Sequence, residues 1–232
     1  MEVIGQGGFG VVFDIGDNKV LKAFKVSVNE SHELIDRRLM ALNDFLSEKK
    51  SYEMLNDLFG GNESVIKHFP AYFGEVNVSD YLGVNDIEDY HLFDKGIVIE
   101  KLDADCNFRW WSLTDSWWND DSKKYIKDFL SEPERLSLLN EVEPILALLK
   151  AHKIAFNDSD IDMFITKKNG VIEFKLIDFS LCTLMAFSNL LHSNSKFSNE
   201  VREFLASGLM ANIEYYNNQI PDDLNFSEFI VR

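Results

Sequence analysis

The sequence predicts a mixed α+β protein with two lobes, an antiparallel sheet plus one helix followed by a reduced, mainly helical part. Three observations carry this prediction. A cluster of glycines runs into Val11-Val12-Phe13, and such β-branched and aromatic residues favour an extended chain. Apolar residues between positions 35 and 55 recur at helical spacing. Gly96-Ile97-Val98-Ile99 is a short apolar strand, after which the chain becomes helical and aromatic, so we place the boundary between residues 1–101 and 102–232 of one domain.

The first element is a β-hairpin that follows Gly5-Gln6-Gly7-Gly8-Phe9-Gly10. A dinucleotide-binding fingerprint would continue from its last glycine into a helix, and here the chain continues into a strand. The turn at residues 14–18 then leads to a second strand, Lys19 to Phe24, which carries Lys22. A glycine-rich flap with a lysine on the next strand is suited to covering and gripping phosphates.

A long helix is expected next, with Asn29 and Ser31 as candidate N-cap residues. Glu48 lies three residues after Phe45 and four before Tyr52, which places its carboxylate in the apolar stripe of this helix. A carboxylate that faces a core needs a cation as partner. Lys22 on the neighbouring strand is the available cation, so we predict an ion pair between Lys22 and Glu48.

The second part of the chain begins with tryptophans at positions 110, 111, 117 and 118, a spacing of seven that puts them on one helical face. We favour core packing for this face over binding of a partner. Another helical stripe runs from Leu136 to Leu149, and Pro144 predicts that the helix either kinks or starts there.

An acidic loop and a second hairpin follow. Asp158, Asp160 and Asp162 lie close together in the loop, Asn169-Gly170 suits a type I′ turn, and the return strand ends at Asp178. Carboxylates at one side of a cleft can hold Mg²⁺ against phosphate oxygens and orient a hydroxyl nucleophile.

Composition narrows the class of protein. The chain has 232 residues, 46% of them apolar, and no stretch of about 18 apolar residues that would span a membrane. The glycine segment begins so early that no signal peptide is expected.

Cys106 and Cys182 are isolated, which favours a reducing compartment. The net charge of −16 disfavours nucleic acid and anionic membranes as partners and suits a basic partner. The cysteines and the charge favour a cytoplasmic protein, inside a host cell if the source is a virus or a bacterial effector. We also expect a monomer.

With these residues in hand, the chain resembles the protein-kinase superfamily over residues 4–182. The resemblance implies a bilobal protein-kinase-like fold in which Lys22 contacts the ATP phosphates and pairs with the helix-C Glu48. Asp158 aligns with the catalytic aspartate, and Asp178 aligns with the metal-binding aspartate of D-F-G, with Asp162 as a second candidate metal ligand. Residues implied to contact ATP are Ile4, Gly5, Gln6, Gly7, Gly8, Phe9, Gly10, Val12, Val20, Lys22, Ile99, Glu100 and Leu102.

Several positions depart from the family pattern. The H-R-D motif reads Phe156-Asn157-Asp158, and Met163 stands where a metal-binding asparagine is expected. A thioether is a poor ligand for Mg²⁺, so Asp160 or Asp162 would have to replace it. The third residue of D-F-G is Ser180, no A-P-E follows, and the remaining residues, about 50, suit only two short helices near 200–209 and 211–218. This pattern indicates a minimal kinase of viral or bacterial type.

The resemblance implies an ATP-dependent phosphotransferase that uses Mg²⁺ or Mn²⁺, with a Ser/Thr protein kinase as the first interpretation. Two alternatives stay open. One is a pseudokinase that acts as a binding or regulatory module, and the other is a small-molecule kinase of the aminoglycoside-phosphotransferase type.

Overall fold

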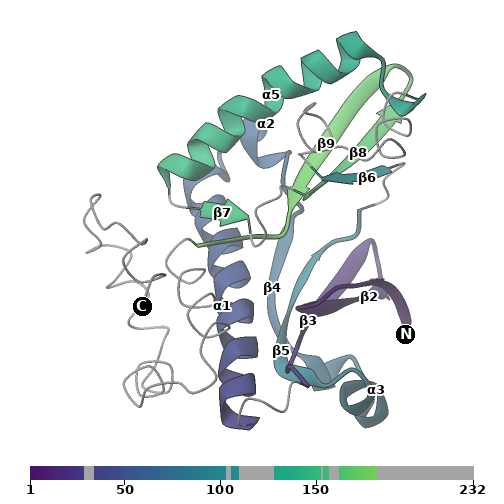
Figure 1. Ribbon diagram of the computed structural model, residues 1–232, viewed down its shortest axis with the longest axis vertical. Helices are drawn as coiled ribbons and strands as arrows, with labels where there is room; N and C mark the ends of the chain where they lie inside the picture. Colours follow the sequence, from purple (N-terminus) through teal and green to yellow (C-terminus); the bar gives the residue numbers. More distant parts are fainter. Residues whose placement is uncertain (29–33, 103–105, 110–127, 153, 157–161, 182–232) are drawn as a thin grey trace. The chain divides into compact units, whose positions relative to one another are not determined.

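The structure, a computed structural model, describes residues 1–28, 34–102, 106–109, 128–152, 154–156 and 162–181 (Figure 1). These residues form two compact units. The first unit consists mainly of Met1–Lys50 and Tyr72–Lys101, and the second mainly of Ser51–Ala71 and Leu102–Ser180. Both units contain helices and strands, which confirms the predicted α+β class.

The first unit is built on a five-stranded antiparallel sheet. Its strands are β1 (Glu2–Gln6), β2 (Gly10–Gly16), β3 (Lys19–Lys25), β4 (Tyr72–Asn77) and β5 (Leu92–Glu100), in the order β1-β2-β3-β5-β4. The predicted hairpin of β2 and β3 is confirmed. Asp17 and Asn18 at its turn have φ values of 50° and 58°, as a type I′ turn requires. Strand β1 is not predicted from the sequence, because the glycines obscure its pattern.

Alternation along β2 and β3 gives the sheet two buried faces. On one face, Phe13 and Leu21 belong to a core cluster that also contains Val78 and Leu82. The 3₁₀ helix η1 (Val78–Asp80) and helix α3 (Val84–Asp89) pack residues against this cluster. Strand β5 passes so close to β3 that a Cβ on Gly96 would lie 2.8 Å from the carbonyl oxygen of Lys22, and only glycine fits there.

Helix α1 (Leu34–Phe59) packs on the other face, where Phe24 of β3 meets Phe45 edge to face with ring centroids 5.8 Å apart. The predicted apolar stripe is confirmed, since Phe45, Tyr52 and Leu55 are buried. The candidate N-cap residues Asn29 and Ser31 lie outside the described residues.

The second unit contains helices α2 (Glu63–Ile66) and α5 (Glu132–Ala151) together with five strands. These are β6 (Cys106–Arg109), β7 (Ile154–Phe156), β8 (Asp162–Lys168), β9 (Val171–Ile177) and β10 (Phe179–Leu181), arranged as the sheets β6-β8-β9 and β10-β7. The predicted hairpin of β8 and β9 is confirmed. Asn169 and Gly170 at its turn have φ values of 53° and 79°.

Two expectations for the second unit are wrong. The chain after Lys101 was expected to become helical, yet Cys106–Arg109 forms strand β6, because pairing with β8 supplies backbone partners that local sequence does not reveal. A helix start at Pro144 is also wrong, since α5 begins at Glu132 and contains this proline. The tryptophan segment 110–118 and the two predicted C-terminal helices lie outside the described residues. Among the helices of the described part, none has the length and apolarity to cross a membrane.

The first turn of α5 carries a pH-sensitive contact. Glu134 pairs with Lys167 at 2.9 Å and accepts hydrogen bonds from the backbone and hydroxyl of Ser131, both 2.8 Å long. The contact with Lys167 first, and then those with Ser131, lower the pKa of Glu134 from 4.5 to about 2. A lowered pKa stabilises the fold above pH 4.5, and this contribution is lost as the pH falls toward 2.

We therefore expect Glu134→Gln to melt below the wild type at pH 7, because glutamine keeps the cap acceptor and loses the charge. The difference in melting temperature should shrink between pH 4.5 and about 2, as thermal melts followed by circular dichroism would show. Glu132→Gln in the same turn serves as the control. A difference that stays constant over this range would contradict the assignment.

Candidate functional site

The glycine segment joins β1 to β2 and is closed by backbone hydrogen bonds. Gly7 N–H donates to the Gly10 carbonyl at 2.9 Å, and Lys25 N–H donates to the Phe9 carbonyl at 2.9 Å. Gly10 is required by the sheet itself, since a Cβ there would lie 2.9 Å from the Ala23 carbonyl oxygen. At Gly7 and Gly8 a Cβ would meet no described atom within 4 Å, so the packing of the described residues does not explain why they are glycines.

The strand register places Gly5, Val12 and Lys22 in one row across three strands. Gly5 pairs with Val12, and Val12 pairs with Lys22. Directly opposite residues of antiparallel strands point to the same face, so Val12 and Lys22 share the face on which α1 packs. Val20, two positions before Lys22, belongs to this face as well and pairs with Ile99. Four of the predicted ATP contacts therefore lie close to Lys22 in the strand register, namely Gly5, Val12, Val20 and Ile99. A fifth, Ile4 on β1, is exposed.

Lys22 and Glu48 form the ion pair that the sequence predicts. The Nζ of Lys22 lies 2.6 Å from Oε2 of Glu48, and the two side chains are 15% and 2% exposed. Removing one partner of a pair this buried typically costs about 3–5 kcal/mol. The pair therefore fixes the ammonium of Lys22 on the face of the sheet that also carries Val12.

The end of β5 carries the next predicted contacts. Ile99 is buried in the strand, Glu100 is its last residue and half-buried, and Leu102 follows as a half-buried residue. Between them, Lys101 is held by two contacts to the β2–β3 hairpin. Its N–H donates to the Asn18 carbonyl at 2.9 Å, and its Nζ donates to Asp14 Oδ2 at 2.6 Å, which lowers the pKa of Asp14.

The two predicted metal ligands occupy neighbouring backbone positions at one end of the β8–β9 hairpin. Asp162 is the first residue of β8 and pairs with Ile177, and Asp178 follows Ile177 directly. Asp178 is half-buried and has φ 62°, a conformation uncommon for a residue with a side chain. Backbone strain of this kind often occurs at functional sites. Among the described residues no group of three or more metal-binding side chains is formed.

Met163 lies in the middle strand of the β6-β8-β9 sheet and is completely buried. Phe108 and Leu176 are its neighbours on the two adjacent strands. The side chain that replaces the expected asparagine is therefore a core residue. It is not available as a metal ligand in this conformation.

Asp158 and Asp160 lie outside the described residues, and the strands that flank them in sequence are described. Strand β7 ends at Phe156, two residues before Asp158. It pairs with β10, which begins directly after Asp178. The pairing of β7 with β10 therefore brings the segment that precedes Asp158 next to the segment that follows Asp178.

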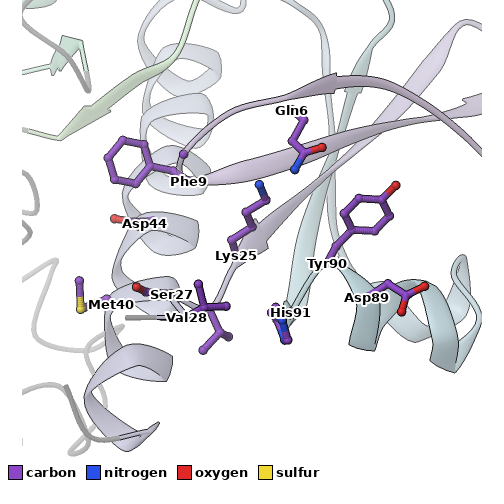
Figure 2. A pocket seen from close by; sticks show the side chains of 12 residues that line it. Gln6, Phe9, Lys25, Ser27, Val28, Met40, Asp44, Asp89, Tyr90 and His91 are labelled. Atoms are coloured by element: carbon purple, nitrogen blue, oxygen red, sulfur yellow. The ribbon is translucent and has the colours of Figure 1, made fainter. Parts of the chain in front are cut away.

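A pocket of about 380 Å³ opens beside the glycine segment within the first unit (Figure 2). Gln6, Gly8 and Phe9 line one side, and the end of β3 with Lys25, helix α1 and the turn before β5 supply the rest. Its volume is at the lower end of the range for small-molecule sites. Its lining includes three of the predicted ATP contacts, and it includes neither Val12 nor Lys22.

Two contacts near the site were not predicted. Lys25 Nζ donates to the carbonyl of Gly7 at 3.0 Å and so ties the glycine segment to β3. Lys49 forms an ion pair with Glu75 of β4 next to the Lys22–Glu48 pair. The sequence gives only a weak signal for these two contacts, because lysines such as Lys25 and Lys49 are common on the exposed faces of strands and helices.

No protein-family model matches the sequence, and no curated protein matches it. Among solved structures, the fold is similar to that of SAICAR synthase from Saccharomyces cerevisiae complexed with SAICAR. The TM-score is 0.48 and the sequence identity 10%, over 95% of this chain and 96% of that chain. A second structure of a SAICAR synthase matches with a TM-score of 0.48 and 9% identity over the same shares. Similarity at this level does not identify a shared activity.

Proposed function

We propose that this protein is an ATP-dependent phosphotransferase, most simply a Ser/Thr protein kinase. The observation that carries the proposal is the buried Lys22–Glu48 pair, with Nζ and Oε2 2.6 Å apart, in register with Val12 and Gly5 next to a glycine segment. A lysine ammonium held in this way is suited to the α- and β-phosphates of ATP. Exposed Gly7 and Gly8 allow a close approach of phosphate oxygens to the backbone N–H groups.

In the proposed reaction, the hydroxyl oxygen of the acceptor attacks the γ-phosphorus while the bond to the β–γ bridging oxygen breaks and ADP leaves. Asp158 is assigned the role of accepting the hydroxyl proton. Lys22 neutralises phosphate charge, and Glu48 keeps Lys22 in place. Val12, Val20 and Ile99 form the apolar surface assigned to the adenine, with backbone contacts from Glu100 and Leu102.

Mg²⁺ or Mn²⁺ fits the residues assigned to it, because carboxylates are the hard oxygen ligands that these ions prefer. Asp162 and Asp178 lie at neighbouring positions at the end of the β8–β9 hairpin, and the fully buried Met163 leaves the role to these acids. When bound, the ion would neutralise phosphate charge. The chain's own contribution is to keep two acidic residues at one strand end.

The acceptor and the cellular setting are part of the same proposal. A net charge of −16 favours a basic protein substrate and disfavours nucleic acid or anionic membrane. Two isolated cysteines suit a reducing, cytoplasmic environment. We propose a monomer that acts inside the cell, which is a host cell if the source is viral or an effector.

A pseudokinase is the second candidate, and one observation favours it. Met163 is buried in the β6-β8-β9 sheet at the position where the family supplies a metal ligand. If Asp162 does not replace that ligand, ATP would bind without transfer of its phosphate. The Lys22–Glu48 pair and the glycine segment would then bind the nucleotide without taking part in a reaction.

The proposal is tested by replacing Lys22. We expect Lys22→Met to lower the transfer of labelled γ-phosphate from ATP by about 10²–10³-fold, because a fixed charge next to the phosphates is removed. ATP should also raise the melting temperature of the wild type and have little effect on that of the variant. The assay uses Mg²⁺ and, separately, Mn²⁺, with the protein itself and a generic basic protein as acceptors.

The matched control is Lys19→Met, which removes a lysine from the same strand that contacts the ring of Phe73 and not Glu48. Equal losses in both variants would show a general effect of charge or stability. A wild type that neither transfers phosphate to any protein or small-molecule acceptor nor gains stability from ATP would refute the proposal. Transfer to a small cationic acceptor alone would identify a small-molecule kinase.

A further inference from the structure

Helix α1 is attached to the sheet by a second ion pair one residue after Glu48. Lys49 Nζ donates a hydrogen bond to Glu75 Oε2 on β4, and the two side chains are 9% and 42% exposed. The contact with Lys49 is the main reason why the pKa of Glu75 is lowered. Lys95 of β5 lies 3.9 Å from the other oxygen of Glu75 and is itself held by Asn77 at 2.8 Å.

The two pairs hold the helix along different directions. Successive residues of a helix are about 100° apart around its axis. Glu48 reaches to β3, and Lys49 reaches to β4, with β5 between these strands in the sheet order. Figure 1 shows α1 running alongside the strands of this sheet. A single ion pair constrains the rotation of the helix in one direction, whereas two pairs from adjacent residues that reach different strands constrain it in both.

The two pairs also have opposite polarity. The helix supplies an anion to Lys22 and a cation to Glu75. If the helix turned by one residue in one direction, Lys49 would approach Lys22. If it turned the other way, Glu48 would approach Glu75. Each incorrect rotation brings like charges together, and this costs free energy in addition to the lost pairs.

We propose that Lys49 and Glu75 are positioning residues that set the rotation of α1 and so keep Glu48 on Lys22. Their importance for phosphate transfer rests on the proposed function, whereas the positioning itself does not. Arg38 provides a comparison on the same helix. It pairs with Asp94 of β5 at 2.8 Å through largely exposed side chains. Arg38 lies about three helical turns before Glu48, so its contact tethers α1 at a distance from Lys22.

The test measures how fast an amine-reactive reagent labels Lys22, read by mass spectrometry on the full chain without nucleotide. In Glu48→Gln the labelling rate of Lys22 should rise, because the ammonium loses this carboxylate partner. The increase in Glu48→Gln is the reference, and we expect the increase in Lys49→Met to be at least half as large. Lys49→Arg, which keeps the cation, and Arg38→Met should both label as the wild type does.

Glu75→Gln breaks the same pair from its exposed end and should raise the rate as Lys49→Met does, which provides a second variant if the first fails to fold. Wild-type labelling of Lys22 in a folded Lys49→Met or Glu75→Gln variant would overturn the proposal. So would an equal rise in Arg38→Met. Because the labelling needs no ATP, its outcome is independent of the transfer assay, and failure of the proposed function would be seen there alone.

Discussion

Replacement of Asp158 by alanine is expected to lower the rate of phosphate transfer by about 10²–10⁴-fold, which is the usual contribution of a positioned general base. The affinity for ATP should change little. The residues assigned to ATP lie on the glycine segment, on β2 and β3, and at the end of β5, and Asp158 belongs to none of these elements. The loss should therefore be found in kcat, with KM for ATP close to that of the wild type.

The measurement compares wild type, Asp158→Ala and Ser159→Ala for labelled phosphate transfer and for the rise in melting temperature with ATP. Ser159 is the matched control, because it is the next residue in the sequence and has no role in the proposed reaction. Transfer that persists at the wild-type rate in Asp158→Ala would contradict the assignment. Binding of ATP by all three proteins without transfer by any of them would favour the pseudokinase.

Phe13→Ala is expected to destabilise the fold by about 3–5 kcal/mol, the cost of removing a large side chain from a packed core. Phe13 is 1% exposed and meets the ring of Tyr90 edge to face, with centroids 5.8 Å apart and an angle of 79° between the rings. It belongs to the cluster that joins β2 and β3 to η1 and α3. The loss is a large fraction of the total stability of a typical domain, about 5–15 kcal/mol.

Urea denaturation followed by circular dichroism would measure this loss. Phe73→Ala is the control, since Phe73 is also a phenylalanine on a strand of the same sheet and is 52% exposed. Its contact with Lys19 is worth only about 0.5–1 kcal/mol at an exposed site. Equal destabilisation by the two substitutions would show that the cluster around Phe13 is not the core of the first unit.

Local sequence was sufficient to predict the two hairpins and the long helix. In both hairpins the turn residues require positive φ, and Asp17-Asn18 and Asn169-Gly170 are of the types that adopt it readily. The Lys22–Glu48 pair was predictable because a carboxylate in an apolar stripe demands a cation, and the strand before the helix offers one. These inferences use neighbours in sequence or the simplest antiparallel pairing.

Features that depend on non-local pairing were not predictable. Strand β6 exists because β8, more than 50 residues later, has an edge to pair with. The Lys49–Glu75 contact requires knowledge that β4 is the outermost strand beyond β5. Of the two expectations for Pro144, the helix start is wrong, because the packing of α5 through Val142, Ile145 and Leu149 outweighs the local cost of a proline inside the helix.

The attachment of Lys101 to the β2–β3 hairpin has a consequence for how this chain can change over evolution. Lys101 is fixed to Asn18 and Asp14 at the point where the chain leaves β5. An insertion or deletion after this point would change the following segment and leave β5 in place, because the contacts of Lys101 hold the end of the strand. Chain length beyond residue 101 can therefore vary while the register of the five-stranded sheet is preserved.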